Sequence, residues 1–357
     1  MHTFVHYSIL YMHEFTILLE RWYDLHGRNL PWRMTKDPYR IWVSEIVLQQ
    51  TRVEQGLSYY LRFIERFPDV SSLAVASEDD VLCLWQGLGY YSRARHLHEA
   101  ARKIHENGYF PSTKEGLLAL PGVGEYTAAA IGSFAFGLPL AVVDGNVYRV
   151  LTRYFGIPTP IDSSEGKREV QLLAAEMLDK ENSGKYNQAI MDFGALQCVP
   201  LHPCCEECPL MDSCSAKVQG KVDVLPVKSR RTKVKDRYLT YIYVCDAEGR
   251  TLVHKREGDD IWRGLYEWPL LESEQPLPVR EIQDNYPTAK LTLFQQGVQH
   301  QLSHRLLHID FYLAEVPVLP EGEGRVVEKE ELATLAFPKP LVDAMACLEN
   351  VLLSRKE

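Results

Sequence analysis

The hydrophobic pattern of the chain changes once, near residue 217, and this change limits the folds open to it. From about Phe15 to Ala216, apolar residues recur every three or four positions, as in "IWVSEIVLQQTRVEQGLSYYLRFIERF", which predicts helices. Beyond residue 237, "RYLTYIYVCDAEGRTLVHKRE" predicts two strands around a "DAEGR" turn, and "LTLFQQGVQHQLSHRLLHIDFYLAEV" holds further strand. "PLVDAMACLENVLLSR" predicts a closing amphipathic helix. We therefore expect a multidomain protein, with an all-α domain followed by a small α+β domain.

The stretch at which the pattern changes is basic. Residues 217–237 contain eight Lys or Arg against two Asp or Glu, and one proline. This composition predicts a linker that either contacts DNA or is a solvated tether. We expect four parts: an N-terminal extension (1–13), a helical domain (14–216), the linker (217–237) and the α+β domain (238–357). The helical pattern begins near Met12, where we expect translation to start.

Length and charge narrow the class of protein. A chain of 357 residues suits two domains, and a formal charge of -9 argues against a wholly basic nucleic-acid binder while leaving room for local basic patches. No run approaches 18 uninterrupted apolar residues, and the N-terminus has no Lys or Arg before Ile9. We expect a cytoplasmic protein (nucleoid-associated if bacterial) whose cysteines stay reduced.

Five of the eight cysteines lie within residues 198–214. Four of them are separated by six, two and five residues: Cys198, Cys205, Cys208 and Cys214. A zinc ribbon usually has two C-x2-C pairs, whereas a compact loop with a Cys-Pro step suits a [4Fe–4S] cluster better. Zinc and an incidental thiol cluster remain alternatives, and Cys204 could compete with Cys205. The other three lie in apolar segments and should be buried structural thiols: Cys83, Cys245 and Cys347.

The segment "LPGVGEYTAAAIG" (120–132) predicts a glycine turn that opens onto a helix. We expect the backbone N–H groups of Gly122, Val123 and Gly124 to point outward and attract a phosphate, although a purely steric role for the glycines stays open. No lysine follows as a nucleotide-binding P-loop would require. Twenty residues beyond Gly124, Asp144 in "VVDGNVYRVLTR" is an N-cap candidate.

Together, the glycine turn, the later aspartate and the cysteine loop resemble the helix-hairpin-helix superfamily of DNA base-excision glycosylases. Two of its families carry the cysteine loop, endonuclease III and MutY. The similarity to the MutY adenine-DNA glycosylases runs from about residue 14 to 237, in blocks that include "LPWR", "WVSEIVLQQTRV", "GLGYYSRARHL", "LPGVGEYTA", "VDGNVYRVLTR" and "NQAIMDFGALQC". The resemblance implies that Asp144 is the catalytic aspartate and that the four cysteines hold a [4Fe–4S] cluster.

The resemblance also implies how the base would be removed. Tyr126 stands where endonuclease III has the lysine that forms an imine and cuts the strand, so we expect no strong lyase activity. Glu45 would protonate adenine N7, and its apolar neighbours in "IWVSEIVLQ" should raise its pKa; without the resemblance it would be an ordinary helix glutamate. Asp144, unprotonated and beside Asn146, would stabilise the oxocarbenium-like transition state or trap it covalently.

Further residues follow from the same resemblance. The extruded adenine would be surrounded by Trp32, Arg33 and Gln188, and the duplex would be held open by Gln50 and Tyr90. From the residues alone, Tyr90 and Tyr91 could be core aromatics. Arg93 and Arg95 could form a solvated face or contact phosphate.

The C-terminal part resembles the Nudix-like domain of MutY, in which "GLYEWP" (264–269) matches a strand and turn. Glu267 and Glu272 follow Gly264, but the R-E-x2-E-E helix of a Nudix hydrolase does not, so we expect recognition rather than hydrolysis. The resemblance implies that Ser303 and His304 contact 8-oxoguanine, with Leu302 in place of the family's phenylalanine. An ordinary strand end is the alternative.

The sequence therefore predicts a monofunctional adenine-DNA glycosylase. It would act as a monomer on double-stranded DNA with an adenine:8-oxoguanine or adenine:guanine mispair, leaving an abasic site. It would not associate with membranes, and repair or replication proteins could bind its linker. The rivals are an endonuclease III-like pyrimidine glycosylase/lyase, a non-catalytic lesion-binding protein and an iron–sulfur redox carrier.

Overall fold

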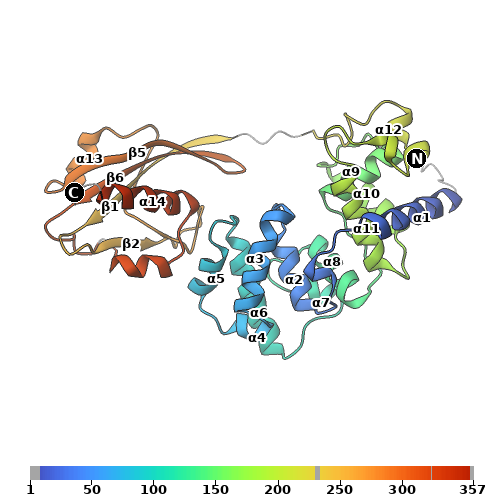
Figure 1. The fold of residues 1–357 in the computed structure, drawn as a ribbon, viewed down its shortest axis with the longest axis horizontal. Helices are drawn as coiled ribbons and strands as arrows, with labels where there is room; N and C mark the ends of the chain where they lie inside the picture. The colour runs from blue at the N-terminus through green and yellow to red at the C-terminus, as the bar shows by residue number, and fades with distance from the viewer. Residues whose placement is uncertain (1–8, 230–233, 323, 354–357) are drawn as a thin grey trace. The chain divides into compact units, whose positions relative to one another are not determined.

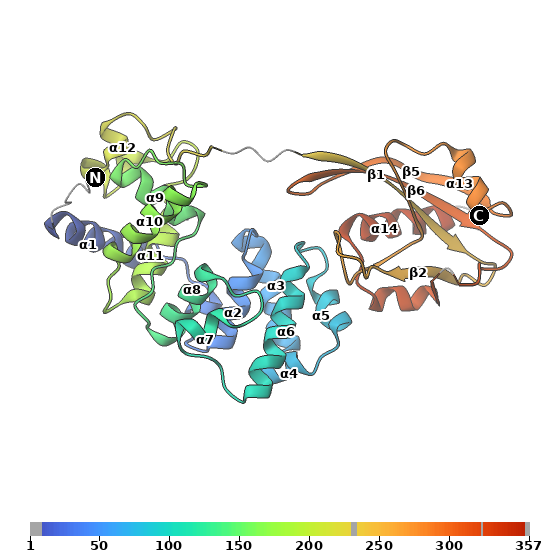
Figure 2. The same ribbon diagram turned by 180° about the vertical axis from the view of Figure 1, so that it is seen from behind.

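The computed structural model describes residues 9–229, 234–322 and 324–353 (Figures 1 and 2). The chain divides into two compact units that are not continuous in sequence. The first unit comprises Met1–Val53, Phe67–Ser71 and Glu99–Arg231; the second comprises Glu54–Arg66, Ser72–His98 and Thr232–Glu357. Part of the predicted helical domain thus clusters with the C-terminal residues. The linear domain boundaries stay a prediction.

Helices make up the first unit, as the three- and four-residue periodicity predicted. Its main helices are α1 (Ile9–His26), α2 (Pro38–Val47), α7 (Lys114–Leu118), α8 (Glu125–Phe136), α9 (Gly145–Phe155), α10 (Ser164–Met177), α11 (Ser183–Leu196) and α12 (Ser215–Val218). Short 3-10 turns lie at Pro31–Arg33, Cys205–Glu207 and Met211–Ser213. The residues of helices α4 (Val70–Ala74) and α6 (Ser92–Asn107) are divided between the two units.

Small residues bring α8 close to its neighbours. Its alanines at 128–130 are buried, and Ala129 and Ala130 share a core cluster with Ile41 of α2. A Cβ on Gly184 of α11 would come within 2.9 Å of the carbonyl oxygen of Ser133 on α8. The alanine-rich sequence therefore lets α2 and α11 approach α8 closely, and the candidate catalytic residues lie on α2, on α8 and at the start of α9.

The second unit joins α3 (Val53–Arg66) and α5 (Glu78–Trp85) to a seven-stranded mixed sheet. The strand order is β3-β2-β1-β6-β5, with β4 paired to β1 and β7 to β2. The strands are β1 (Lys235–Cys245), β2 (Thr251–Lys255), β3 (Tyr266–Glu267), β4 (Leu270–Ser273), β5 (Lys290–Gln301), β6 (Arg305–Glu315) and β7 (Arg325–Val327). Helix α13 (Val279–Asn285) precedes β5, a 3-10 turn lies at Lys329–Thr334, and α14 (Lys339–Leu353) ends the described chain.

The predicted strands and closing helix of this unit are confirmed. The "DAEGR" turn joins β1 to β2 as an antiparallel pair, with Cys245 opposite Thr251. Asp246 accepts a hydrogen bond from the backbone N–H of Arg250 (2.9 Å), and Gly249 takes the left-handed conformation (φ +85°) that glycine allows without strain. Strands β1 and β6 run parallel over eleven residue pairs and form the centre of the sheet.

One expectation about the chain needs correction. Only Cys245 of the three expected core thiols is buried; Cys83 and Cys347 are partly buried, and the Cys83 thiol donates to the carbonyl of Thr334 (3.1 Å). The predicted linker is partly structured, because α12 extends to Val218 and β1 begins at Lys235. Residues 230–233 of that linker, and most of the N-terminal extension, lie outside the described residues.

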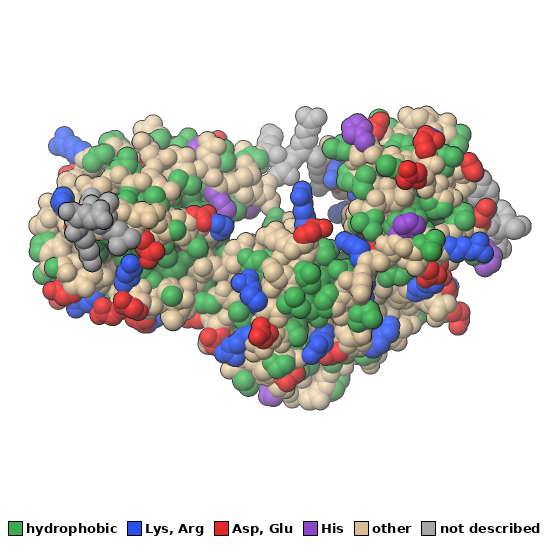
Figure 3. Space-filling view, in the orientation of Figure 1, with side chains coloured by type: hydrophobic (Ala, Val, Ile, Leu, Met, Phe, Trp, Pro, Cys, Tyr) green, Lys and Arg blue, Asp and Glu red, His purple; other side chains and the backbone are tan. Residues whose placement is uncertain are grey.

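The first half of the predicted linker is bound to the helical unit. Leu225 accepts a hydrogen bond from Arg153, Val227 from the N–H of Ile161, and the carboxylate of Asp162 accepts from the N–H of Ser229. In Figure 3, acidic and basic side chains are interspersed over the visible face. Within the described residues, every helix is too short or too polar to span a bilayer.

Candidate active site

Glu45 lies near the end of α2 and is only 6% exposed. Burial raises the pKa of its carboxyl to about 7, and the nearby negative charge of Asp144 adds to the rise. A hydrogen bond from Tyr126 and the positive charge of Arg33 oppose this shift. The predicted burial and raised pKa are therefore both present, and Glu45 can hold a proton at neutral pH.

Tyr126 lies in the first turn of α8 and donates its phenol hydrogen to Oε2 of Glu45 (2.8 Å). Burial raises the pKa of Tyr126 well above its ordinary value, so the phenol stays protonated and remains a donor. A tyrosine at this position therefore orients the carboxyl of Glu45, and it has no amine with which to form an imine.

Asp144 is the N-cap of α9 and accepts a hydrogen bond from the backbone N–H of Val147 (2.8 Å). Its second carboxylate oxygen accepts from Nδ2 of Asn146 (2.8 Å). Burial raises the pKa of Asp144, while these hydrogen bonds lower it by favouring the charged form. The capping interpretation is thus correct, and it leaves Asp144 in electrostatic contact with Glu45.

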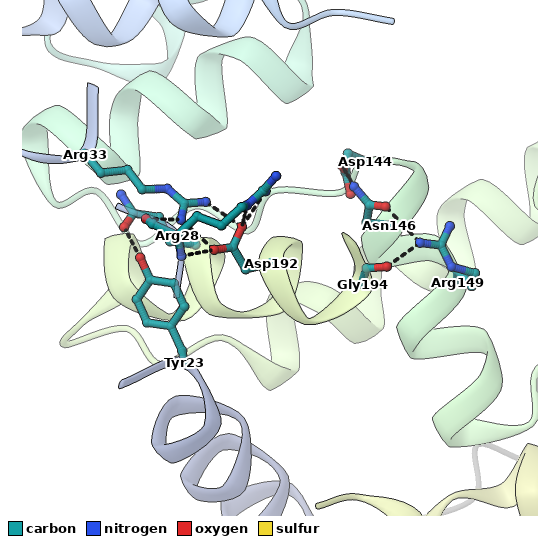
Figure 4. A network of polar contacts seen from close by, with 9 residues as sticks. Tyr23, Arg28, Arg33, Asp144, Asn146, Arg149, Asp192 and Gly194 are labelled. Atoms are coloured by element: carbon teal, nitrogen blue, oxygen red, sulfur yellow. Dashed lines mark hydrogen bonds and ion pairs between the residues drawn. The ribbon is translucent and has the colours of Figure 1, made fainter. Parts of the chain in front are cut away.

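Arg149, which the sequence analysis missed, hydrogen-bonds to Asn146 (Figure 4). Its NH2 group donates to Oδ1 of Asn146 (2.8 Å) and to the carbonyl of Gly194 (2.5 Å), and its Nε donates to the carbonyl of Cys198 (2.7 Å). A single buried guanidinium therefore joins α9, α11 and the start of the cysteine loop. The available signal in the sequence was an arginine inside the predicted helix "NVYRVLTR". The structure buries this arginine to 9% exposure, which is rare for a charged residue without partners.

Gly194 sets how closely α11 approaches the start of α9. A Cβ at this position would lie 2.6 Å from Cβ of Asn146 and 3.0 Å from its carbonyl oxygen. Real contacts are not that short, so only glycine allows the observed spacing.

Arg33, expected near the base, points its guanidinium at Asp192 of α11 (Figure 4). The pair is bidentate, with NH1 to Oδ2 at 2.6 Å and NH2 to Oδ1 at 2.8 Å. Arg28 binds the same carboxylate through its backbone N–H, Nε and NH2. Asp192 is fully buried; burial alone would raise its pKa, but the two arginines outweigh burial and hold the pKa below its ordinary value.

Gln188 lies one turn before Asp192 on α11, so both side chains share a helix face. The hydroxyl of Tyr23 donates to Oε1 of Gln188 (2.8 Å), and the guanidinium of Arg33 lies 5.8 Å from the centre of the Tyr23 ring. Trp32 precedes Arg33 in the same 3-10 turn and is 6% exposed. The structure therefore brings Arg33 and Gln188 together through two residues that the sequence analysis missed, Tyr23 and Asp192.

The glycine turn differs in one respect from expectation. Gly122 is left-handed (φ +72°), and Gly124 caps α8 without a side chain, which leaves the first N–H groups of α8 without a capping acceptor. The N–H of Val123, however, donates to the carbonyl of Leu120 (3.2 Å) inside the turn. Val123 is therefore not an outward-facing phosphate donor; its buried side chain anchors the turn instead.

The four expected cysteines line one small cavity of about 30 Å³. They are Cys198, Cys205, Cys208 and Cys214. Cys204 is exposed, which favours Cys205 as the second ligand. Arg153 and Lys217 also line this otherwise largely apolar cavity and could balance the charge of four thiolates. Among the described residues, no three or more His, Cys, Asp or Glu are grouped to hold a single metal ion.

Arg153 attaches the cysteine loop to α9. Its NH1 group donates to Sγ of Cys198 (3.5 Å) and to the carbonyl of Val199 (2.8 Å), and NH2 donates to the carbonyl of Pro200 (2.9 Å). Cationic hydrogen bonds to a ligand sulfur fit an iron–sulfur site, where they stabilise the negative cluster. The donor set and its surroundings are therefore compatible with such a cluster.

Two expected DNA contacts have strained backbones. Gln50 follows α2, is exposed and has φ +56°; Tyr90 is 47% exposed and has φ +50°. Tyr91 is a core residue at 6% exposure, so the two tyrosines have different environments. A left-handed conformation in a non-glycine residue costs free energy and is common at functional sites.

Arg93 and Arg95 are both partly buried rather than solvated. The Arg93 guanidinium lies 5.4 Å from the ring centre of Trp85 and 5.5 Å from that of Tyr90, and burial lowers its pKa to about 10. Arg95 donates to the carbonyl of Arg263. Neither expected interpretation, a solvated face or a free phosphate contact, describes them fully.

Ser303 and His304 lie in the turn between β5 and β6, which Leu302 closes by donating its N–H to the carbonyl of Arg305 (2.8 Å). The hydroxyls of Ser303 and Tyr90 are 2.5 Å apart, so the structure joins two expected DNA-contacting residues. These residues line a pocket of about 650 Å³ within the second unit, which also contains Trp262 and His300.

Known protein families match residues in both units of the chain. Residues 43–176 match the HhH-GPD superfamily of base excision DNA repair proteins, and residues 240–346 match the NUDIX domain. The chain is 33% identical over 314 residues to an adenine DNA glycosylase of Buchnera aphidicola subsp. Acyrthosiphon pisum, covering 86% of this chain and 88% of the relative. It is 44% identical over 207 residues to a human adenine DNA glycosylase, covering 55% of this chain and 38% of the relative.

Solved structures agree on the helical part. A thermostable thymine-DNA glycosylase matches with a TM-score of 0.54 and 30% identity, over 58% of this chain and 97% of that protein. An endonuclease III in a non-covalent DNA complex matches with a TM-score of 0.51 and 21% identity, over 58% of this chain and 97% of that chain, which shows the shared fold. The HhH-GPD and NUDIX matches, together with relatives that align over most of their length, show that the chain belongs to the adenine DNA glycosylase family.

Proposed function

We propose that the protein is a monofunctional glycosylase that removes adenine mispaired with 8-oxoguanine or guanine and leaves an abasic site. Membership of the adenine DNA glycosylase family indicates a hydrolase that binds DNA and acts in base excision repair. The observation that carries the finer proposal is the hydrogen bond from Tyr126 to Glu45 next to Asp144. This arrangement places a protonatable acid, Glu45, near a second carboxyl group, Asp144, and Tyr126 provides no amine nucleophile.

In this proposal, Glu45 gives its proton to N7 of adenine as the bond between adenine and the deoxyribose breaks. The electron pair of that bond leaves with the base, and positive charge develops on the sugar. Asp144 stabilises that charge, and its hydrogen bonds from Val147 and Asn146 favour the carboxylate form. Water then adds to the anomeric carbon and its proton passes to a carboxylate, which gives the abasic site and free adenine.

The surrounding residues would bind the DNA. Trp32 and Gln188 would contact the extruded adenine, with Arg33 held beside them by Asp192. Gln50 and Tyr90, whose left-handed backbones project them from exposed turns, would hold the duplex open. The turn at Gly122 and Gly124 and the uncapped start of α8 would bind a backbone phosphate.

The cysteine loop would hold a [4Fe–4S] cluster through Cys198, Cys205, Cys208 and Cys214. Its role would be to order the loop for DNA contact, since hydrolysis requires no electron transfer. We expect a brown protein with broad visible absorbance that Cys198→Ser abolishes. A colourless, active protein that contains zinc would overturn this assignment.

Recognition of 8-oxoguanine would belong to the second unit. Ser303 and His304 face the 650 Å³ pocket, and the contact between Ser303 and Tyr90 would couple lesion recognition to duplex opening. We place the protein in the cytoplasm, as a monomer on double-stranded DNA, with the linker as the candidate surface for repair or replication partners.

Single-turnover cleavage of labelled duplexes tests the proposal. Adenine would be placed opposite 8-oxoguanine, guanine or thymine, with and without hot alkali. We expect breaks only after alkali, and only opposite 8-oxoguanine or guanine. Breaks without alkali would indicate an endonuclease III-like lyase, and tight binding without cleavage would indicate a lesion-binding protein.

A further inference from the structure

Tyr23 is placed to control the base-binding side of the candidate site, although it belongs to α1 and lies far from Glu45 in sequence. Its hydroxyl donates to Oε1 of Gln188 across 165 sequence positions. Burial raises the pKa of Tyr23, so the phenol stays protonated and acts as a donor at neutral pH. In this contact the phenol is the donor and the amide carbonyl of Gln188 is the acceptor.

An amide side chain can present either of two opposite hydrogen-bonding ends. When Tyr23 donates to the carbonyl end of Gln188, the amino end is left to face a ligand. That amino group donates to none of the described residues. A free N–H donor suits an acceptor ring nitrogen such as N1 of adenine, and it opposes the ring N–H that guanine and thymine carry at the corresponding edge.

Tyr23 is itself held in place by Arg33. The guanidinium of Arg33 lies 5.8 Å from the centre of its ring, and Asp192 fixes that guanidinium through two hydrogen bonds. Arg33 also interacts electrostatically with Glu45. Gln188 is thus connected to the acid through Tyr23 and Arg33, on the side of the candidate site that would hold the base.

We propose that Tyr23 is a positioning residue for substrate selection: by occupying the carbonyl of Gln188, it presents the amide N–H groups to an acceptor nitrogen of the extruded base. The inference rests on the proposed function, because it assigns Gln188 to the adenine pocket. Tyr23 touches Gln188 and not the base, and its effect should therefore vanish when Gln188 is removed.

A double-mutant cycle tests this directly. Single-turnover rates would be measured on duplexes with adenine opposite 8-oxoguanine for wild type, Tyr23→Phe, Gln188→Ala and the double variant. Tyr23→Phe keeps the ring beside Arg33 and removes only the hydroxyl. We expect each single variant to be about tenfold slower, and the double variant to be no more than about threefold slower than either. Additive losses of about 100-fold, or a Tyr23→Phe rate within twofold of wild type, would overturn the proposal.

A second measurement separates positioning from a general structural effect. Duplexes carrying 1-deazaadenine or 3-deazaadenine lack one acceptor nitrogen each. Wild type should lose rate on at least one of them, and Tyr23→Phe should lose less, with no shift in the pH profile set by Glu45. As a control, Tyr39→Phe removes another phenol hydrogen bond, to the carbonyl of Phe67 (2.7 Å), and should leave the deaza-to-adenine rate ratio unchanged.

The outcomes distinguish a failure of the proposed function from a failure of the role assigned to Tyr23. A wild-type protein that releases no adenine from any duplex would refute the proposed function and this inference with it. An active wild type whose deaza-to-adenine ratio is the same in Tyr23→Phe would refute the inference alone.

Discussion

Glu45 and Asp192 are two buried carboxyl groups of the same helical unit, and their environments drive them in opposite directions. Glu45 is 6% exposed and receives one hydrogen bond from a neutral phenol, and its pKa rises to about 7. Asp192 is fully buried and bound by two guanidinium groups, and its pKa falls. Burial is similar in both; the charge of the partner decides which carboxyl can hold a proton.

Glu45→Gln tests the protonated side of this comparison and should have the largest effect. We expect the single-turnover rate to fall by about 1,000-fold, because general acid catalysis contributes on the order of 100- to 10,000-fold. The same change should stabilise the fold at pH 8. A raised pKa means that the stability contribution of Glu45 is fully present below its unfolded value of 4.5 and is lost as pH rises through about 7.

Denaturant unfolding at pH 8 and pH 4.5 checks this pair of effects. The gain at pH 8 should be at most about 3 kcal/mol, since one pKa unit corresponds to about 1.4 kcal/mol, and it should vanish at pH 4.5. An inactive variant with unchanged or reduced stability at pH 8 would show that burial does not raise the pKa of Glu45.

Asp192→Asn tests the ionised side. The change leaves two guanidinium groups without a buried counter-charge, and we expect a loss of about 3 kcal/mol in the free energy of unfolding at pH 7. Arg28 retains some exposure to water (27%), which limits the cost. Asp24→Asn, at an exposed ion pair with Lys185, is the matched control and should cost less than about 1 kcal/mol. Equal losses in both variants would contradict the comparison.

The wild-type pH profile gives a smaller effect. Since Glu45 must be protonated, the single-turnover rate should decline above about pH 7 and approach a tenfold loss per pH unit. Rates between pH 5.5 and 9 on a saturating duplex would measure this. A rate that stays level to pH 9 would exclude Glu45 as the acid.

Tyr126→Phe should give the smallest change. The phenol donates to the carboxylate form and lowers the pKa of Glu45, so its removal should move the basic limb of the profile to higher pH. One hydrogen bond is worth about 1 kcal/mol, and we expect less than a tenfold change in the maximal rate. A limb displaced to lower pH would mean that the phenol acts in some other way.

The sequence predicted the local environments well. Apolar neighbours in "IWVSEIVLQ" correctly indicated that Glu45 is buried. The position of Asp144 directly before "GNVYRV" correctly indicated that Asp144 caps a helix. The change from helical to strand periodicity correctly separated the helical segments from the sheet. These features depend on residues near one another in the chain, which is where pattern is informative.

The hydrophobic pattern could not predict contacts between residues that are far apart in the sequence. Glu45 and Tyr126 are 81 positions apart, and Arg33 and Asp192 are 159 apart. An aspartate inside the apolar stretch "AIMDFGAL" was a signal, because a buried charge requires a partner, but two arginines could only be assigned to it once the fold was known. The assignment of residues 54–66 and 72–98 to the same compact unit as the sheet had no sequence signal at all.

Gly194 gives the candidate site an unusual kind of vulnerability. A single methyl group there would overlap Asn146 and force the start of α9 outward, although it would change no side chain that touches DNA. A displacement of about 1 Å in a reacting group can cost on the order of 100-fold in rate. A chain with every catalytic residue intact could therefore be inactive, and a search for damaging variants that follows only the chemistry would pass over this position.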